Sequence, residues 1–89
     1  MNQSAFINEV TLEGYAEAVI VTREANGSIG DHSHPFAAKA LILEGEIRIV
    51  VKNVSTTYLP GDLFQLDVGT LHQEYYGPQG VSYLVGRRA

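Results

Sequence analysis

Residues 40–52 read ALILEGEIRIVVK, and this stretch decides the fold class. Within it Ile47, Ile49 and Val51 alternate with more polar side chains. Alternation with a period of two places successive side chains on opposite faces of a β-strand, and it is typical of a strand that is buried on one side. We therefore expect one strand on each side of Gly45, which can adopt the positive φ of a turn.

The same alternation continues outward along the chain. It recurs in residues 16–23 and 81–87, and residues that favour turns lie between the runs, at Asn26-Gly27, Pro60-Gly61-Asp62 and Gly77-Pro78-Gln79-Gly80. We expect the last of these turns to close a hairpin. Seven or so short strands without room for helical crossovers predict an all-β, antiparallel barrel or sandwich, formed by one domain over residues 1–89.

Composition excludes several classes of function. The chain of 89 residues has no cysteine and a net charge of −4, so neither a disulfide nor a thiolate metal site is available. No cluster of lysine or arginine exists to bind a row of phosphates, which excludes nucleic acid as the expected partner. Because no apolar segment reaches the length of a membrane span and no signal peptide is recognisable, we expect no membrane contact and a cytoplasmic location.

Two histidines separated by one residue form the sharpest chemical feature. On a strand, His32 and His34 would point to the same face roughly 6.5 to 7 Å apart, which allows both imidazoles to converge on one ion at about 2.0 to 2.1 Å. The alternative is a pair of surface histidines beside the loop at residues 27–31. The histidine pair alone does not decide between these two interpretations.

The spacing of histidines and glycines resembles the two motifs of the cupin superfamily. The first motif, G-x5-H-x-H-x3 or x4-E-x6-G, is matched by His32, His34 and Gly45, and the second, G-x5-P-x-G-x2-H-x3-N, by Gly61, Gly69 and His72. This resemblance covers roughly residues 26 to 76. It implies a small RmlC-like jelly-roll barrel in which His32, His34 and His72 meet on one divalent metal ion, either zinc, iron, nickel or manganese.

One departure from the cupin pattern affects the metal ligands. Ala38, or Lys39 if the longer spacing is counted, occupies the place of the usual ligand glutamate. Glu74 lies two residues beyond His72 and would share its inward face on a regular strand. It could then be the fourth ligand, orient a histidine, or act as a general base, and the alternative is an exposed acid at the rim of the barrel.

Other residues are candidates for the pocket. By alternation Tyr76 would face inward and contact a ligand or pack, Phe36 would form part of an apolar wall, and Gln65 could line the pocket or point outward. We expect Arg87 and Arg88, at the end of the last strand, to be solvated charges, and the alternative is an arginine pair that binds an anion.

Three hypotheses for function follow from this site. The first is a metal-dependent enzyme of dioxygenase or isomerase type, in which Glu74 is catalytic and the positive metal centre attracts a small anionic or oxygen-bearing substrate. The second is a module that binds or senses a small ligand without turnover. The third is a barrel whose metal site has decayed. In each case we expect a homodimer, because the short chain has strand edges to protect.

Overall fold

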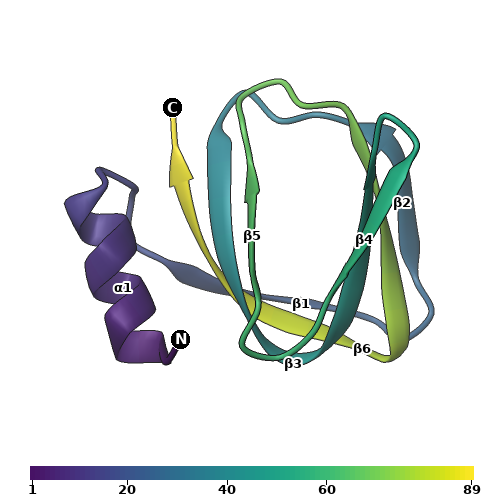
Figure 1. Cartoon of the computed structure of the whole chain (residues 1–89), viewed down its shortest axis with the longest axis horizontal. Coiled ribbons are helices and arrows are strands. Elements are labelled where there is room, and N and C mark those ends of the chain that lie inside the picture. The colour runs from purple at the N-terminus through teal and green to yellow at the C-terminus, as the bar shows by residue number, and fades with distance from the viewer.

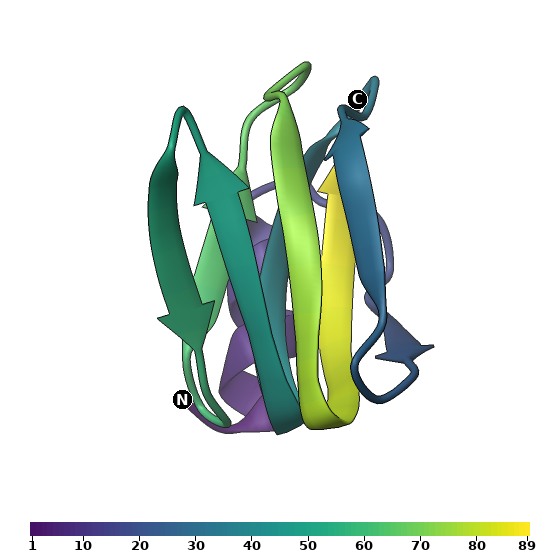
Figure 2. The ribbon, with the colours of Figure 1, turned by 90° about the vertical axis from the view of Figure 1, so that its right-hand side faces the viewer.

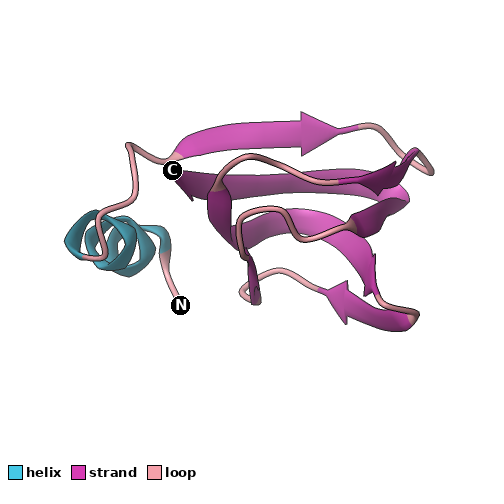
Figure 3. Cartoon of the chain, turned by 90° about the horizontal axis from the view of Figure 1, so that it is seen from above, coloured by secondary structure: helices cyan, strands magenta, loops and turns pink.

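The computed structural model describes all 89 residues and contains one helix and six strands (Figure 1). In chain order the elements are α1 (Gln3–Leu12), β1 (Val19–Arg23), β2 (Ser28–His32), β3 (Ala37–Val51), β4 (Val54–Tyr58), β5 (Leu63–Leu66) and β6 (His72–Arg88). Every strand pair is antiparallel. The strands curl into a barrel, seen from above in Figure 3, and the helix lies outside it. This confirms the expected all-β, antiparallel jelly-roll fold.

Two long strands organise the barrel. β3 and β6 pair with each other from Ala37↔Arg88 to Val50↔Gln73. All other strands attach to one of these two, because β1 and β2 pair with β6, whereas β4 and β5 pair with β3. Figure 2 shows β3 and β6 side by side in the wall of the barrel. Each long strand therefore pairs with two short strands as well as with the other long strand.

The six strands are close to the seven or so expected, but two of them are long, and the last expected hairpin is wrong. The segments on either side of Gly45 join into β3, and the segment at residues 77–80 remains inside β6. Gly45 and Gly80 both have positive φ values, of 72° and 73°, and the β3–β6 register shifts beside Gly45. A bulge with a left-handed residue bends a strand without ending its ladder. The glycines therefore bend the long strands where turns were expected.

Helix α1 was not expected from the sequence. Asn2 caps its first turn, where the side-chain oxygen accepts a hydrogen bond from the Ala5 amide at 2.8 Å. Phe6 and Val10 are fully buried, and their spacing of four residues places them on one face of the helix. These are the only two buried residues of the helix, so its apolar periodicity is weak. No helix of the structure has the length and apolar character needed to cross a membrane.

The buried side chains form two separate clusters. One contains eleven residues inside the barrel, among them Ile47, Phe64 and Tyr83. The other contains six residues between α1 and the outside of the sheet, among them Phe6 and Leu84. Successive residues of β6 thus alternate between the two clusters. The helix covers the outer face at one side, and the inner face is left to form the site.

Candidate metal centre

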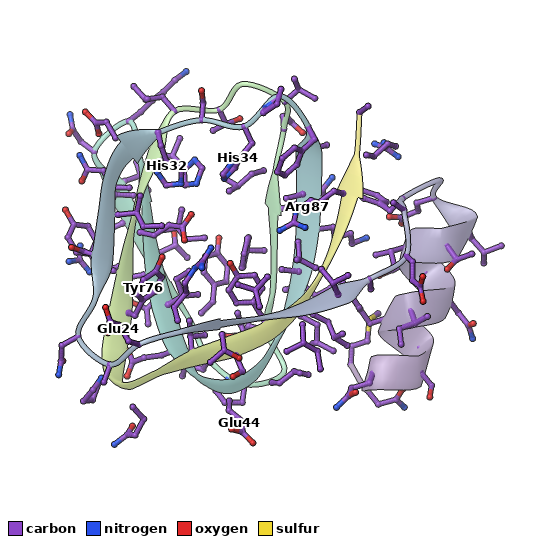
Figure 4. The ribbon with its side chains drawn as sticks, turned by 180° about the vertical axis from the view of Figure 1, so that it is seen from behind. Glu24, His32, His34, Glu44, Tyr76 and Arg87 are labelled. Atoms are coloured by element: carbon purple, nitrogen blue, oxygen red, sulfur yellow. The ribbon has the colours of Figure 1, made fainter.

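Three histidine rings meet inside the barrel. His32 ends β2 and is paired with His72, the first residue of β6. Their ring centroids are 4.1 Å apart, and those of His34 lie 5.0 Å from His32 and 5.4 Å from His72. His34 follows the end of β2 instead of continuing the strand, yet its ring points to the same side (Figure 4). The structure therefore brings together the three histidines that the sequence singled out.

Glu74 completes this cluster from the same face of β6 as His72. Its Oε2 atom lies 3.0 Å from Nε2 of His32 and 3.0 Å from Nε2 of His72. Its other oxygen, Oε1, accepts a hydrogen bond of 3.1 Å from the hydroxyl of Tyr76. Glu74 is 7% exposed and lies within the barrel, which is not the position of an exposed acid at the rim.

Main-chain carbonyl oxygens contact the Nδ1 atoms of His32 and His72. Nδ1 of His32 lies 2.7 Å from the carbonyl oxygen of Gly30, and Nδ1 of His72 lies 2.9 Å from that of Thr70. Because a carbonyl oxygen only accepts, each Nδ1 must carry the proton and donate it. In a neutral imidazole Nε2 then presents a lone pair, and both Nε2 atoms face a carboxylate oxygen. Two lone pairs and a carboxylate oxygen that converge in this way can hold a metal cation, or a proton on Nε2 of either histidine.

The cluster fits a divalent metal ion in donor type and in size. His32, His34, His72 and Glu74 each offer one ligand atom, and these atoms all lie within 4.8 Å of one another. Two ligands on opposite sides of an ion at about 2.1 Å would be about 4.2 Å apart, so the widest separation exceeds this by only a few tenths of an ångström. Three imidazoles and one carboxylate suit zinc, iron, nickel and manganese.

His34 is held in the state that a ligand needs. Burial, followed by the charges of His32 and His72, lowers the pKa of His34 below its ordinary value of 6.5. Its ring stacks on Phe36, with centroids 4.9 Å apart and an angle of 15° between the planes. His34 is therefore neutral near pH 7, and its ring is oriented by an aromatic contact.

A cavity of about 100 Å³ lies next to the cluster. Its lining is mostly apolar and includes two of the histidines, His32 and His34, together with Glu74. The lining residues are Arg23, Ile29, His32, His34, Phe36, Ala38, Phe64, Leu66, Glu74, Tyr83, Val85 and Arg87. The small side chain of Ala38 leaves room for this cavity.

The remaining pocket candidates divide into three cases. Phe36 lines the cavity, as the sequence suggested. Tyr76 is buried and faces inward, but it contacts Glu74 and does not line the cavity. The structure does not bring Gln65 to the pocket, because Gln65 is exposed on the outer face of β5 and its amide donates to the hydroxyl of Tyr15 at 3.4 Å. On β5 the neighbouring Phe64 and Leu66 face inward instead.

Arg87 and Arg88 are both exposed, as expected for solvated charges, but each also makes a contact that the sequence did not indicate. The guanidinium of Arg88 lies 4.5 Å above the ring of Tyr15 and donates to the carbonyl of Glu13 at 2.6 Å, which ties the end of β6 to the end of α1. Arg87 points the other way, into the cavity, and lies 5.3 Å from the ring centre of Phe36 (Figure 4). Alternation along β6 continues past Tyr83 and Val85 to Arg87, and this was the signal in the sequence.

Two tyrosines near the cavity remain protonated over the ordinary pH range. Burial, together with the charge of Glu74, raises the pKa of Tyr76 and that of Tyr83. Both hydroxyls are therefore hydrogen-bond donors. The tyrosines cannot act as bases at neutral pH.

Three solved structures overlap most of this chain at low sequence identity. A cupin-2 domain protein from Shewanella frigidimarina matches with a TM-score of 0.68 at 15% identity, over 82% of this chain and 70% of that one. KdgF from a Halomonas species matches with a TM-score of 0.67 at 17% identity, over 82% and 69%. The cupin domain of Cnp3 from Schizosaccharomyces pombe matches with a TM-score of 0.74 at 16% identity, over 86% and 58%. The chain has the cupin fold.

Likeness at these identities establishes the fold alone. The chain spans 58 to 70% of the length of these three cupins. No family model matches its sequence, and no curated protein matches it either. The chemistry of this cupin barrel therefore has to be derived from its own side chains.

Proposed function

We propose that this cupin barrel binds one divalent metal ion through His32, His34 and His72, with Glu74 as the fourth ligand. The observation that carries the proposal is the convergence of two Nε2 lone pairs and a carboxylate oxygen, with both Nδ1 atoms already engaged by carbonyls. Glu74 thereby takes the role of the glutamate that the cupin pattern places at Ala38. The sequence leaves the choice among zinc, iron, nickel and manganese open.

We further propose that the site acts on a small oxygen-bearing or anionic substrate, as a metal-dependent enzyme of oxygenase or isomerase type. A divalent ion bound here would supply a Lewis acid that polarises an oxygen of the substrate. Three neutral imidazoles and one carboxylate leave net positive charge on a dication, and this charge favours an anion in the adjoining cavity. Tyr83 lines that cavity and can donate a hydrogen bond to such a ligand.

A second candidate is a module that binds a small ligand without turnover. It is favoured by the engagement of both oxygens of Glu74, which contact His32, His72 and Tyr76. A carboxylate that serves as a ligand is not free to act as a general base. The cavity lining contains no other carboxylate. Catalysis would then depend on polarisation of the substrate alone, whereas simple binding needs nothing more.

A homodimer is also proposed, with β1 as the contact surface. β1 pairs with β6 on one edge only, and Val19 and Ile20 on it are 44% and 64% exposed. An exposed strand edge with apolar side chains favours pairing with a second copy. Size-exclusion chromatography with light scattering should give twice the mass of the chain, and Ile20→Lys should reduce it to one. A monomer in the wild-type protein contradicts this proposal.

Zinc titration by calorimetry tests the metal site. Metal-free wild-type protein should bind one zinc ion per chain, and both His34→Ala and Glu74→Gln should weaken the affinity at least about tenfold, since each removes a ligand. Glu44→Gln is the matched control, because Glu44 is exposed and points away from the barrel (Figure 4). Equal zinc affinity in all four proteins, or no binding to the wild type, would leave only a barrel with a decayed site.

A further inference from the structure

Two arginines from different strands line the same small cavity. Arg23 is the last residue of β1, and Arg87 lies one residue before the end of β6. Both contribute to the lining that also contains His32, His34 and Glu74. The whole chain has six lysines and arginines and a net charge of −4. A third of its fixed positive side chains thus lie at one cavity of an acidic protein.

Neither arginine is neutralised by the chain itself. The ion pairs of the structure are made by Lys39 and by the histidines of the metal cluster, and none involves Arg23 or Arg87. Two other arginines are used structurally, because Arg48 lies over Tyr75 and Arg88 binds the carbonyl of Glu13. Glu74, the one carboxylate of the cavity, is engaged by His32, His72 and Tyr76. The two guanidinium groups therefore lack an anionic partner.

The positive charge of these arginines reaches the site. Arg87 lies 5.3 Å from the ring centre of Phe36, and the same ring stacks on His34. Both arginines line the same cavity as His32 and His34, so their positive charges add to that of a metal ion bound there. The arrangement favours a ligand with oxygen atoms at both ends.

We propose that Arg23 and Arg87 bind the carboxylate of a small organic acid whose other oxygen faces the metal ligands. Guanidinium groups match the planar geometry of a carboxylate and can hold it with two hydrogen bonds. The cavity of about 100 Å³ is well below the roughly 300 to 1,000 Å³ of pockets for drug-sized ligands, which restricts the acid to a few heavy atoms. The substrate class is thus a short dicarboxylate or an oxo- or hydroxy-carboxylate. The metal-facing half of this inference rests on the proposed function.

Malonate is a suitable probe, and malonamide is its neutral analogue. Calorimetry on zinc-loaded wild-type protein should detect malonate and no malonamide. Arg87→Gln and Arg23→Gln should each weaken malonate binding at least about tenfold, since each removes a charge-assisted hydrogen bond. Arg87→Lys should remain weaker than wild type, because a point charge does not replace the planar fork. Arg48→Gln is the matched control and should bind malonate as the wild type does.

Zinc affinity, measured on the same variants, separates the two proposals. It should not fall in any arginine variant, because no arginine is placed among the ligands. If zinc binds but malonate does not, or if malonate binds equally to the Arg87→Gln and Arg23→Gln proteins, the carboxylate site is wrong and the metal site stands. If the wild type takes no zinc, malonate is titrated into metal-free protein. Binding that depends on the arginines then supports the carboxylate site without the metal, and any other result overturns both.

Discussion

His32 and His72 are oriented in the same way by the chain. Each Nδ1 donates to the carbonyl of the residue two positions earlier, Gly30 or Thr70. This local contact sets the tautomer and aims Nε2 at Glu74 before any ion is present. Preorganisation of this kind lowers the cost of assembling a metal site.

Ala38 tests whether the carboxylate ligand of the metal site can come from β3 instead of β6. Its side chain is buried and lines the cavity, at the place where the cupin pattern has a glutamate. Glu74→Gln should lose zinc affinity, and Ala38→Glu added to it should restore much of that affinity, because a carboxylate returns to the cavity from β3. Lys39→Glu in the same background is the control, because Lys39 faces α1. Zinc calorimetry on the three variants measures this, and restoration by Lys39→Glu instead would contradict the inward placement of Ala38.

The sequence could predict which residues meet, but not every side-chain direction. Motif spacing brought His32, His34 and His72 together, and strand alternation added Glu74. Gln65 lies in the short run Leu-Phe-Gln-Leu, where apolar residues occupy both phases, so the pattern does not fix which face Gln65 takes. Arg87 continues an inward alternation, but its place near the end of the chain suggested a solvated charge.

Among the elements, strand β3 depends on Gly45 for its bend. A Cβ atom there would collide with the main chain of Gly80, whereas the Cβ of an alanine at Gly61 would meet no atom. Both glycines have positive φ, so both alanine variants incur the backbone strain of about 1 to 2 kcal/mol. Gly45→Ala should lower the free energy of unfolding by about 3 kcal/mol or more, because overpacking is added. Denaturant unfolding measures both variants, and equal losses would contradict the close approach of β3 and β6.

Helix α1 is fixed to the barrel by an ion-pair cluster as well as by its apolar stripe. Nζ of Lys39 lies 3.2 Å from Glu9 and 2.9 Å from Glu13, and the hydrogen bond to Glu13 is the main cause of the raised pKa of Lys39. A raised lysine pKa means that this stabilisation is present at neutral pH and is lost as the pH rises through the raised value.

Lys39→Met should therefore loosen α1 at neutral pH. We expect a loss of about 1 kcal/mol in unfolding free energy, because both glutamates are partly exposed, together with faster hydrogen exchange of the α1 amides. Lys52→Met, at the exposed turn after β3, is the control. Unchanged exchange in α1 would show that Phe6 and Val10 alone hold the helix.

Helix α1 shows why some elements are not predicted from the sequence. Strand alternation is repeated across the sheet and is visible in several runs. In α1, by contrast, only Phe6 and Val10 are buried, while the apolar Ile7 and Leu12 are exposed, so the apolar residues do not mark one face. The joined strands β3 and β6 were read as separate pieces because glycine marks a turn and a bulge alike. Tertiary pairing, which is absent from local sequence, decides between them.

For the whole molecule, a metal site is a source of stability that a short chain without disulfides otherwise lacks. Zinc at 100 times its dissociation constant should stabilise the fold by about 2.7 kcal/mol, which raises the melting temperature by roughly 10 to 20 °C for a chain of this size. Scanning calorimetry with and without a chelator measures the shift. An identical melting temperature in both conditions would mean that no metal binds the folded state.

Metal content is the most direct test of the central claim that His32, His34, His72 and Glu74 form a metal centre. The measurement is plasma mass spectrometry on protein purified without a metal-leaching affinity resin, compared with His34→Ala. We expect one zinc, iron, nickel or manganese ion per chain in the wild type and a clear loss in the variant. A wild-type protein that contains no metal, even after incubation with all four ions, would contradict the claim.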